Sequence, residues 1–410
     1  MKRWVSVMWL FAVSVACMAQ KAMLSGIVVD DKSGQRIAQA TVSVEGTSLS
    51  VVTNDDGYFT LKTDSLAETR MIVSHIGYQS KSLKVPLQKS ASPLVIRLSS
   101  ATIKLQEVVV WTDDPRELVN IAMRKIPDNY ARLPELYKCF YRETAMKHQH
   151  FIYVAEGVTD MFKGPYNRGI NRDRVSIRKG RRLLSPKKGD TLSVKVMGGP
   201  VQSLQLDLVK NRDFLLNEEE LDNYSFQIEP PAVIDNRVQY VISIAPKVTL
   251  PYALYYGRLY IDHETLAFTR IELSLDMSDR DKATSVMLIR KPMGVRFRPK
   301  ELSCLIDYHY NGEVTRISYL RSTFRFNCDW KRKLFATSFT ACCEMVVTDN
   351  SSEDVHPISG HSSFDARDSF YDKVDYFLDP NFWEDYNIIE PTETLDWAIG
   401  KLIKLIPKSK

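Results

Sequence analysis

The residue types that could do chemistry are present in this sequence, but their spacing completes none of the common catalytic motifs. The seven histidines are His75, His148, His150, His263, His309, His356 and His361. None of them begins the zinc-peptidase pattern His-Glu-x-x-His. The sequence also has no Gly-x-Ser-x-Gly nucleophile elbow, no Walker phosphate loop and no Gly-x-Gly-x-x-Gly dinucleotide loop. Since a catalytic triad can be scattered through a sequence, these absences argue against an enzyme without excluding one.

Two short segments could be read as metal sites, and each has a simpler interpretation. His148 and His150 would share one face of a strand. No cysteine is nearby and the closest carboxylates are Glu143 and Glu156, so a solvated pair at a hairpin turn is favoured. The segment Asn54–Gly57 offers fewer oxygen ligands than Ca²⁺ takes, and we predict a turn there whose glycine takes positive φ. We therefore predict no metal and no cofactor.

The stretch between residues 168 and 188 is rich in basic residues, and it is the one charged region that stands out from the rest of the sequence. Its cations are Arg168, Arg172, Arg174, Arg178, Lys179, Arg181, Arg182, Lys187 and Lys188, and Asp173 is its only acid. One interpretation is a solvated, mobile loop between strands, because glycine and proline recur in the same region. The other is a surface for anionic lipid, lipopolysaccharide or an acidic partner, since clustered cations beside a membrane each add attraction. The candidate contacts are then Arg172, Arg174, Arg178, Lys179, Arg181 and Arg182.

The first twenty residues have the pattern of an export signal. Two basic residues precede an apolar run from Trp4 to Ala16, and small residues surround Ala19. The run is shorter than the ~20 apolar residues that a membrane-spanning helix needs. Cleavage after Ala19 is favoured over lipidation of Cys17, because Ser14 stands where a lipoprotein signal usually has a larger aliphatic residue. Removal of residues 1–19 lowers the formal charge from +5 to +3, so nucleic acid is not the implied partner.

Short alternating runs separated by turn signals predict a small β-sandwich from Ala22 to Leu98. Its distinctive motifs are Gly26-Ile27-Val28-Val29-Asp30, Ala40-Thr41-Val42-Ser43-Val44, Thr53-Asn54-Asp55-Asp56-Gly57-Tyr58-Phe59 and His75-Ile76-Gly77-Tyr78. In this order they resemble the carboxypeptidase-regulatory-like (transthyretin-like) domain. Gln35-Arg36 departs from the family, which commonly has a proline that would stiffen a turn there. The resemblance implies an accessory sandwich without peptidase chemistry.

A strand-like segment after the sandwich carries a second resemblance. Leu105-Gln106-Glu107-Val108-Val109-Val110 is similar to the segment that follows this domain in TonB-dependent outer-membrane receptors of Bacteroidota. In those receptors a plug and a long transmembrane barrel come next. Too few residues remain here for such a barrel. The sequence instead predicts a helix that is capped at Thr112 or Asp113, has Pro115 near its first turn and ends at Pro127.

From Tyr137 onward, longer and more aromatic alternating runs predict a large antiparallel sheet. The predicted strands are Tyr137–Thr144, Ile152–Met161, Leu192–Met197, Tyr224–Ile228, Val238–Ile244, Tyr255–Ile261, Ala267–Leu275, Thr284–Lys291, Leu302–Tyr310, Glu313–Phe326 and Thr337–Val347. The hairpin at 256–267 is similar to strand pairs of periplasmic lipoprotein-carrier proteins, which implies a curved, partly open barrel over a helical lid. Phe140-Tyr141-Arg142-Glu143 resembles a segment of Bacteroidota envelope proteins that join such a sandwich to a β-domain and carry no agreed activity.

These parts define the predicted organisation, which is mainly β. A signal peptide (1–19) precedes the transthyretin-like sandwich (20–100), a linker strand and helix (101–135), a larger antiparallel β-domain (136–376) and a C-terminal tail (377–410). The β-domain is expected to be curved like a half-barrel, with a few helices. The tail contains an amphipathic helix at Leu395–Ile406, which either packs on the β-domain or lies on a membrane surface.

The function predicted from these residues is that of an exported, non-catalytic protein that binds or scaffolds in the periplasm or at the outer-membrane periphery. An envelope protein or an anionic membrane surface is the expected partner. Two alternatives stay open: a lipid or lipoprotein carrier or sensor with a curved-sheet cavity, and a hydrolase with an unrecognised site. A large apolar cavity would favour the carrier, and convergent polar groups with shifted pKa values in a cleft would favour the hydrolase.

Overall fold

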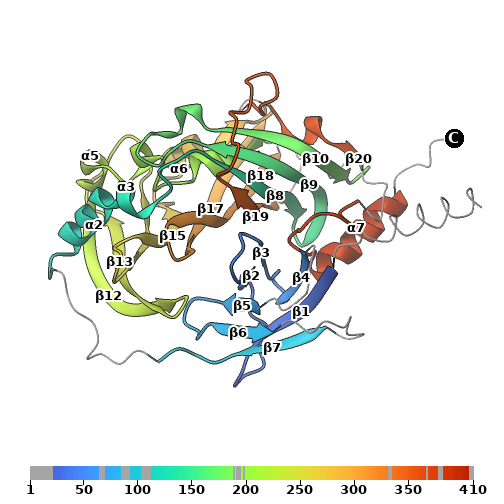
Figure 1. Cartoon of the computed structure of the whole chain (residues 1–410). Helices are drawn as coiled ribbons and strands as arrows, with labels where there is room; N and C mark the ends of the chain where they lie inside the picture. Colours follow the sequence, from blue (N-terminus) through green and yellow to red (C-terminus); the bar gives the residue numbers. More distant parts are fainter. Residues whose placement is uncertain are drawn as a thin grey trace, which may run out of the picture.

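Two β-structured units make up the chain in the computed structural model, a small sandwich and a large sheet that lies over it (Figure 1). The structure describes residues 22–63, 70–84, 93–102, 112–187, 190, 195–196, 199–330, 335–365, 368–376 and 382–405. The predicted signal peptide, Cys17 and the segment Leu105–Val110 lie outside these residues. The mainly β fold class, with a sandwich followed by a large antiparallel sheet, is confirmed.

The sandwich consists of two facing sheets, β4-β1-β7 and β3-β2-β5-β6, within the described residues. Its strands are β1 (Ala22–Asp30), β2 (Thr41–Val44), β3 (Ser50–Val52), β4 (Tyr58–Thr63), β5 (Arg70–Ser74), β6 (Lys81–Lys84) and β7 (Leu94–Leu98). Alternate side chains such as Val28, Val42 and Phe59 point between the sheets and are fully buried. The period-two pattern in the sequence therefore corresponds to a core between two half-buried sheets.

The predicted turn at Asn54–Gly57 is confirmed, and its geometry explains the residue types. The Asn54 side-chain oxygen accepts hydrogen bonds from the backbone N–H of Asp56 at 3.0 Å and of Tyr58 at 2.9 Å. Gly57 has φ +71°, and a Cβ there would lie 2.8 Å from the carbonyl oxygen of Val28. This position therefore needs glycine for its backbone conformation and for its close approach to β1.

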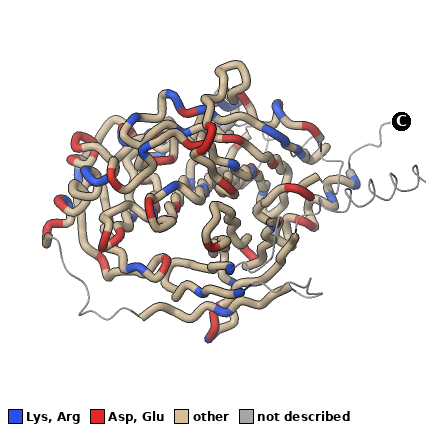
Figure 2. Tube along the Cα trace, viewed as in Figure 1, with Lys and Arg blue, Asp and Glu red and all other residues tan. Residues whose placement is uncertain are grey.

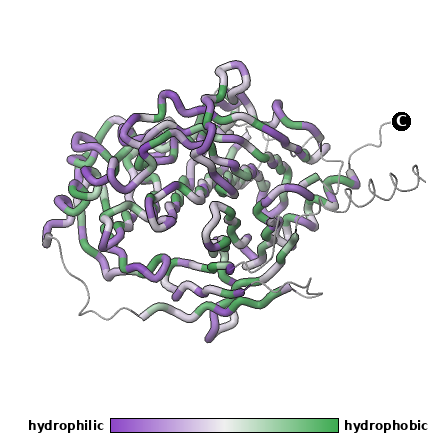
Figure 3. Tube along the Cα trace, viewed as in Figure 1, coloured by the Kyte–Doolittle hydropathy of each residue, from purple (hydrophilic) through white to green (hydrophobic). Residues whose placement is uncertain are grey.

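The large sheet has the order β12-β13-β14-β15-β17-β18-β19-β8-β9-β10-β20. Its strands are β8 (Glu135–Lys147), β9 (His150–Lys163), β10 (Arg174–Leu184), β12 (Tyr224–Ile234), β13 (Arg237–Pro246), β14 (Tyr255–Asp262), β15 (Phe268–Leu275), β17 (Val295–Tyr310), β18 (Thr315–Trp330), β19 (Thr337–Ser351) and β20 (Asp375–Tyr376). All neighbours are antiparallel except β10 and β20. β12 and β20 remain at opposite edges, so the sheet is not closed. Hydrophilic and hydrophobic residues alternate along its strands (Figure 3).

One face of the large sheet carries the main hydrophobic core and is covered by helices. The α-helices on this side are α2 (Pro115–Arg124), α3 (Ile126–Asn129), α4 (Gln202–Gln205), α5 (Glu218–Leu221) and α6 (Arg280–Met287), with the 3₁₀ turn η3 (Arg212–Phe214). A further 3₁₀ turn, η2 (Ile170–Arg172), lies in the connection between β9 and β10. Leu118 and Val119 of α2 pack in one buried cluster with Ile271 and Ile306 of the sheet. We refer to this side as the helix-covered face.

Two predicted details of the helices need correction. The N-cap of α2 is Asp114 rather than Thr112 or Asp113, since its carboxylate accepts from the Arg116 N–H at 2.9 Å. The helix α2 ends at Arg124, before the predicted Pro127. Pro127 instead lies in the first turn of α3, where proline is tolerated because it needs no N–H partner.

Two segments have a different secondary structure from the one predicted. Arg174–Leu184 is the strand β10 and not a loop, because acids on the neighbouring strand β9 pair with its cations. The predicted strand Thr284–Lys291 is mostly helix α6, which Asp279 caps by accepting from two backbone N–H groups. Only Leu288–Arg290 forms a short strand, β16, which pairs with β11 at Lys195–Val196.

The C-terminal segment crosses the second face of the sheet and ends in helix α7 (Glu393–Leu405). Leu395, Ile399 and Leu402 of α7 are buried against Val154 of β9 and Leu183 of β10. The helix therefore packs on the β-domain through its apolar side. We refer to the segment before it, residues 382–391, which begins with a turn at 382–386, as the strap.

The turn glycine gives a first prediction. Gly57→Ala should lower the free energy of unfolding by roughly 1–3 kcal/mol, because alanine is strained at positive φ and its Cβ meets the Val28 carbonyl. Urea unfolding measures this. Gly46→Ala is the matched control, since Gly46 has φ +76° with no atom within 4 Å of the added Cβ. Equal losses for the two variants would show that the close approach to β1 contributes nothing.

Candidate functional site

The second face of the large sheet carries a row of charged residues that crosses eight strands. Directly paired positions in order are Arg258 (β14), Glu272 (β15), Leu305 (β17), Arg321 (β18), Glu344 (β19), Arg142 (β8), Glu156 (β9) and Arg181 (β10). We call these residues the charged row. Positive and negative side chains alternate along it except at Leu305. Figure 2 shows acidic and basic residues interspersed across the sheet.

The row is most deeply buried at Glu156, which is 1% exposed. Its carboxylate oxygens lie 2.7 Å from Arg142 Nη2 and 3.1 Å from Arg181 Nε. Burial alone would raise the pKa of Glu156, but the two guanidinium groups hold that pKa below its ordinary value. The carboxylate is therefore ionised, and the three side chains form a buried ion triad.

The strap covers this triad and uses its remaining hydrogen-bonding capacity. Arg142 Nη2 donates to the Ile389 carbonyl oxygen at 2.5 Å, and the Trp383 indole N–H donates to Glu156 at 3.2 Å. The Arg181 guanidinium lies 4.9 Å from the centre of the Trp383 ring. The strap, which begins with a turn at residues 382–386, is thus held by a carbonyl contact to an arginine, an indole N–H contact to a carboxylate and an aromatic contact to a cation.

The sandwich covers the middle of the row. Arg321 has Leu305 on one side and Glu344, at 3.7 Å, on the other. The Asp55 carboxylate of the sandwich turn binds Arg321 through two hydrogen bonds of 2.7 and 3.1 Å. The turn residue Asp56 accepts from the Glu393 N–H of α7 at 2.7 Å. The acids of this turn therefore dock the sandwich onto the sheet and the C-terminal segment, a role that the sequence did not reveal.

Three further contacts hold the sandwich. Lys62 Nζ donates to the strap carbonyl oxygens of Trp383 at 2.6 Å and Tyr386 at 2.9 Å. Val52 joins an apolar cluster with sheet residues Phe140, Val158, Tyr319 and Val346, to which the strap residues Trp383, Ile388 and Ile389 also belong. At the far edge of the sandwich, the Gly77 N–H donates to the Val233 carbonyl at 2.8 Å. Sandwich, strap and sheet thus share one interface.

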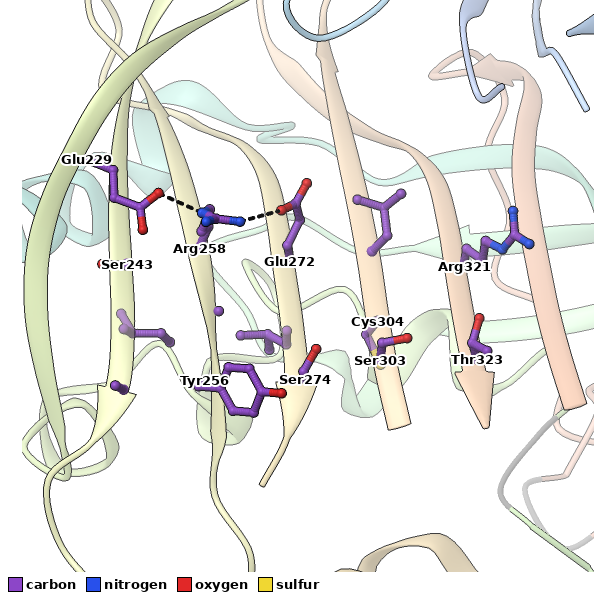
Figure 4. A pocket seen from close by; sticks show the side chains of 15 residues that line it. Glu229, Ser243, Tyr256, Arg258, Glu272, Ser274, Ser303, Cys304, Arg321 and Thr323 are labelled. Atoms are coloured by element: carbon purple, nitrogen blue, oxygen red, sulfur yellow. Dashed lines mark hydrogen bonds and ion pairs between the residues drawn. The ribbon is translucent and has the colours of Figure 1, made fainter. Parts of the chain in front are cut away.

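On strands β12 to β18, this face forms a groove of about 580 Å³ (Figure 4). Its lining residues are Glu229, Ser243, Ile244, Ala245, Tyr256, Gly257, Arg258, Glu272, Leu273, Ser274, Ser303, Cys304, Leu305, Arg321 and Thr323. Arg258 bridges Glu229 at 2.7 Å and Glu272 at 4.0 Å, and Tyr256 is half exposed. The groove therefore continues the charged row beyond the part that the sandwich and strap cover. We call it the open groove.

A second cavity, of about 840 Å³, lies between the β2–β3 hairpin of the sandwich and the β-hairpin ends of the large sheet. Beside it, His309 Nδ1 lies 2.9 Å from the Asp235 carboxylate. Burial would lower the pKa of His309, but Asp235 raises it above its ordinary value. His75, on the sandwich side, behaves in the opposite way, since burial and then the nearby Arg270 lower its pKa to about 4. Titratable groups of both units therefore meet at this interface.

The six cations predicted to contact an anionic surface are Arg172, Arg174, Arg178, Lys179, Arg181 and Arg182, and most of them bind within the protein. Arg178 pairs with Asp160 at 2.6 Å, and Lys179 donates to the Phe382 carbonyl at 2.8 Å. Arg181 belongs to the triad, and Arg182 donates to the Tyr371 carbonyl. Arg174 donates to the carbonyl groups of Asn171 and Asp173, while Arg172 is exposed at the end of η2. An anionic contact at these residues stays a prediction.

The described residues contain neither a metal-binding cluster nor a membrane-spanning helix. His148 and His150 lie at the tip of the β8–β9 hairpin, as the sequence predicted. No group of three His, Cys, Asp or Glu side chains that could hold a metal ion occurs among the described residues. Within the same residues, no helix is long and apolar enough to cross a bilayer.

Comparison with known proteins supports the N-terminal resemblance. The family model described as a CarboxypepD_reg-like domain matches residues 24–110, so it covers the sandwich and none of the large sheet. No curated protein matches the chain. The Bacteroidota and TonB-receptor context stays a prediction.

Solved structures give only distant likenesses. An outer membrane lipoprotein-sorting protein domain from Vibrio parahaemolyticus is 10% identical, with 59% of this chain and 95% of that chain covered and a TM-score of 0.26. A DUF1329 family protein from Desulfovibrio piger is 10% identical over 58% and 94% of the two chains, with a TM-score of 0.23. A LolA superfamily protein from Nitrosomonas europaea is 12% identical over 56% and 94%, with a TM-score of 0.18. At these identities and TM-scores, the likenesses do not support an inference about function.

The buried triad gives a second prediction. Glu156→Gln should lower the free energy of unfolding by about 3–5 kcal/mol, because it leaves two guanidinium groups buried without their counter-ion. Chemical denaturation measures the loss. Glu229→Gln, at the open end of the same face, is the control and should cost less than about 1 kcal/mol. Similar losses for both variants would contradict the anchoring role of Glu156.

His75 gives a pH-dependent prediction. Its folded-state pKa of about 4 lies below its ordinary value of 6.5, so the unfolded chain binds more protons between these values. This part of the stability is complete above pH 6.5 and is lost as the pH falls towards 4, by up to ~2 kcal/mol near pH 5. His75→Gln should reduce the slope of stability against pH in this window, whereas His148→Gln at the exposed hairpin tip should not. Identical slopes for wild type and His75→Gln would refute the prediction.

Proposed function

We propose that this protein is a non-catalytic binding protein of the cell envelope, whose open groove takes an extended polypeptide segment of a partner. The observation that carries the proposal is that the open groove continues the charged row, whose other half already holds the strap. The regulatory-like sandwich closes one side of this surface and fixes it in place. The envelope location rests on the predicted export signal.

The covered half supports a polypeptide as the ligand. There, Arg142 binds a backbone carbonyl and Glu156 binds an indole N–H. The open groove presents the same pair of groups, since Arg258 and Glu272 are directly opposite each other on β14 and β15. Tyr256, half exposed, adds an aromatic surface, and short serine and threonine side chains leave room for a backbone. Arg258 would exchange part of its contact with Glu229 or Glu272 for the incoming carbonyl.

Binding is a better interpretation of the open groove than hydrolysis. Among the described residues that line it, there is no histidine to act as general base for Ser243, Ser274, Ser303 or Thr323. Its two carboxylates, Glu229 and Glu272, both pair with Arg258 and so are already engaged in ion pairs. The polar side chains of the open groove favour binding of a ligand, because they do not form a pair of nucleophile and base.

The carrier alternative receives less support from the helix-covered face. The segment at residues 200–216 lies on that face and contributes Leu204, Leu208 and Leu215 to its core. Buried ion pairs fix this segment, since Asp207 contacts Lys163 and Lys210 lies 2.7 Å from Asp173. Opening this cover would leave these buried charges without partners, which is costly.

Site-specific photo-crosslinking in cells that produce the protein tests this proposal. A photoreactive residue in place of Tyr256 or Ser274 should trap a polypeptide partner, and Arg258→Glu should reduce the yield at least about tenfold, since it places a third acid beside Glu229 and Glu272. A photoreactive residue at Leu133, an exposed side chain on the α3–β8 connection, is the control. The proposal would be abandoned if the open-groove positions and Leu133 gave the same products.

A further inference from the structure

Helix α7 has an outward side that differs from the side packed on the sheet. Trp397 is 64% exposed and Ile403 is 40% exposed, although both are large apolar side chains. Lys401 and Lys404 are exposed on the same helix, and Lys401 Nζ lies 4.8 Å from the centre of the Trp397 ring. Because residues three and four apart share a helix face, Trp397, Lys401 and Lys404 form one outward stripe.

A groove of about 240 Å³ runs beside this stripe, between α7 and the ends of β8, β9 and β10. Its lining includes Trp397 and Lys401 from the helix and Lys147, His150, Phe151 and Lys187 from the strands and their connections. We call it the α7 groove.

The charge of the α7 groove is predominantly positive. Among the described residues that line it, Asp190 is the one carboxylate, and it accepts from Lys147 at 2.9 Å and from the Ser185 hydroxyl at 2.7 Å. The negative charge of Asp190 is thus balanced by Lys147. Lys187 and Lys401 line the groove as additional cations. Aromatic and cationic groups therefore lie together on one exposed surface.

We propose that the α7 groove and the outward stripe of α7 dock on an anionic lipid surface. Tryptophan side chains prefer the boundary between headgroups and acyl chains, and nearby lysines are attracted to anionic headgroups. A small soluble anion would satisfy the lysines but would leave Trp397 in water. A lipid surface accommodates both kinds of side chain, because it offers negative charge above an apolar layer. The inference does not depend on the open groove.

Sedimentation with vesicles tests this inference on the purified protein. Vesicles of phosphatidylcholine with a third of phosphatidylglycerol should bind the protein, and pure phosphatidylcholine should bind it far more weakly. Lys187→Gln and Lys401→Gln should each weaken binding about fivefold, which corresponds to ~1 kcal/mol per lysine near the surface, and raised salt should weaken it further. Trp397→Ala should also reduce binding, because the apolar anchor is lost.

Two substitutions at the other edge of the sheet are the matched controls. Lys247→Gln and Tyr252→Ala remove an exposed cation and an exposed aromatic ring from the β13–β14 connection, and they should leave vesicle binding unchanged. The proposal is overturned if the protein binds neither vesicle or both equally. It is also overturned if the α7 variants bind like the controls.

Discussion

The buried carboxylate of Glu156 between Arg142 and Arg181 is the constraint on which the arrangement of the two units depends. Charges on the second face of an antiparallel sheet ordinarily meet water, and here three of them are removed from it. Such burial is tolerated only when each charge has a partner and each remaining hydrogen-bonding group is used. The strap supplies these contacts through Trp383 and Ile389, so its position follows from the charges beneath it.

The same requirement explains how the sandwich is placed. The charged row is interrupted at Leu305, so Arg321 has a carboxylate neighbour on one side only. Asp55 supplies an acid from the sandwich, and the flanking turn residues bind the C-terminal segment. The Asp55–Arg321 ion pair joins this turn to β18, and the apolar contact of Val52 adds burial beside it. A motif that forms a turn in the sandwich is thus also its attachment point.

Local patterns in the sequence were sufficient for most of the fold. Alternation along single strands predicted the sandwich and most of the large sheet, and the polar turn at Asn54–Gly57 was predicted with its glycine conformation. The strand β10 was missed because its cations look solvated until the acids of β9 are known to lie opposite them. Helix α6 was missed because the capping contacts of Asp279 outweigh the β-branched residues that follow.

The candidate site could not be predicted in the same way. The charged row depends on the register between strands that are far apart in the chain, and Asp55 lies 266 residues before Arg321. A single strand shows only that Arg258, Glu272 or Glu344 occupies a position on one side of the sheet. The one available signal was the recurrence of charged residues among otherwise aliphatic or aromatic strands. Its interpretation requires knowledge of how all eight strands pair.

The position of β8 in the sheet has a consequence for the order in which the molecule can assemble. β8 is the first strand of the large sheet along the chain, yet one of its two neighbours is β19, which is nearly the last. The strap that covers β8 and β9 comes later still. A chain emerging from the ribosome or from an export channel therefore carries Arg142 and Glu156 unshielded until almost all of its length has appeared. Assembly of this face is consequently a late event, governed by the final third of the polypeptide.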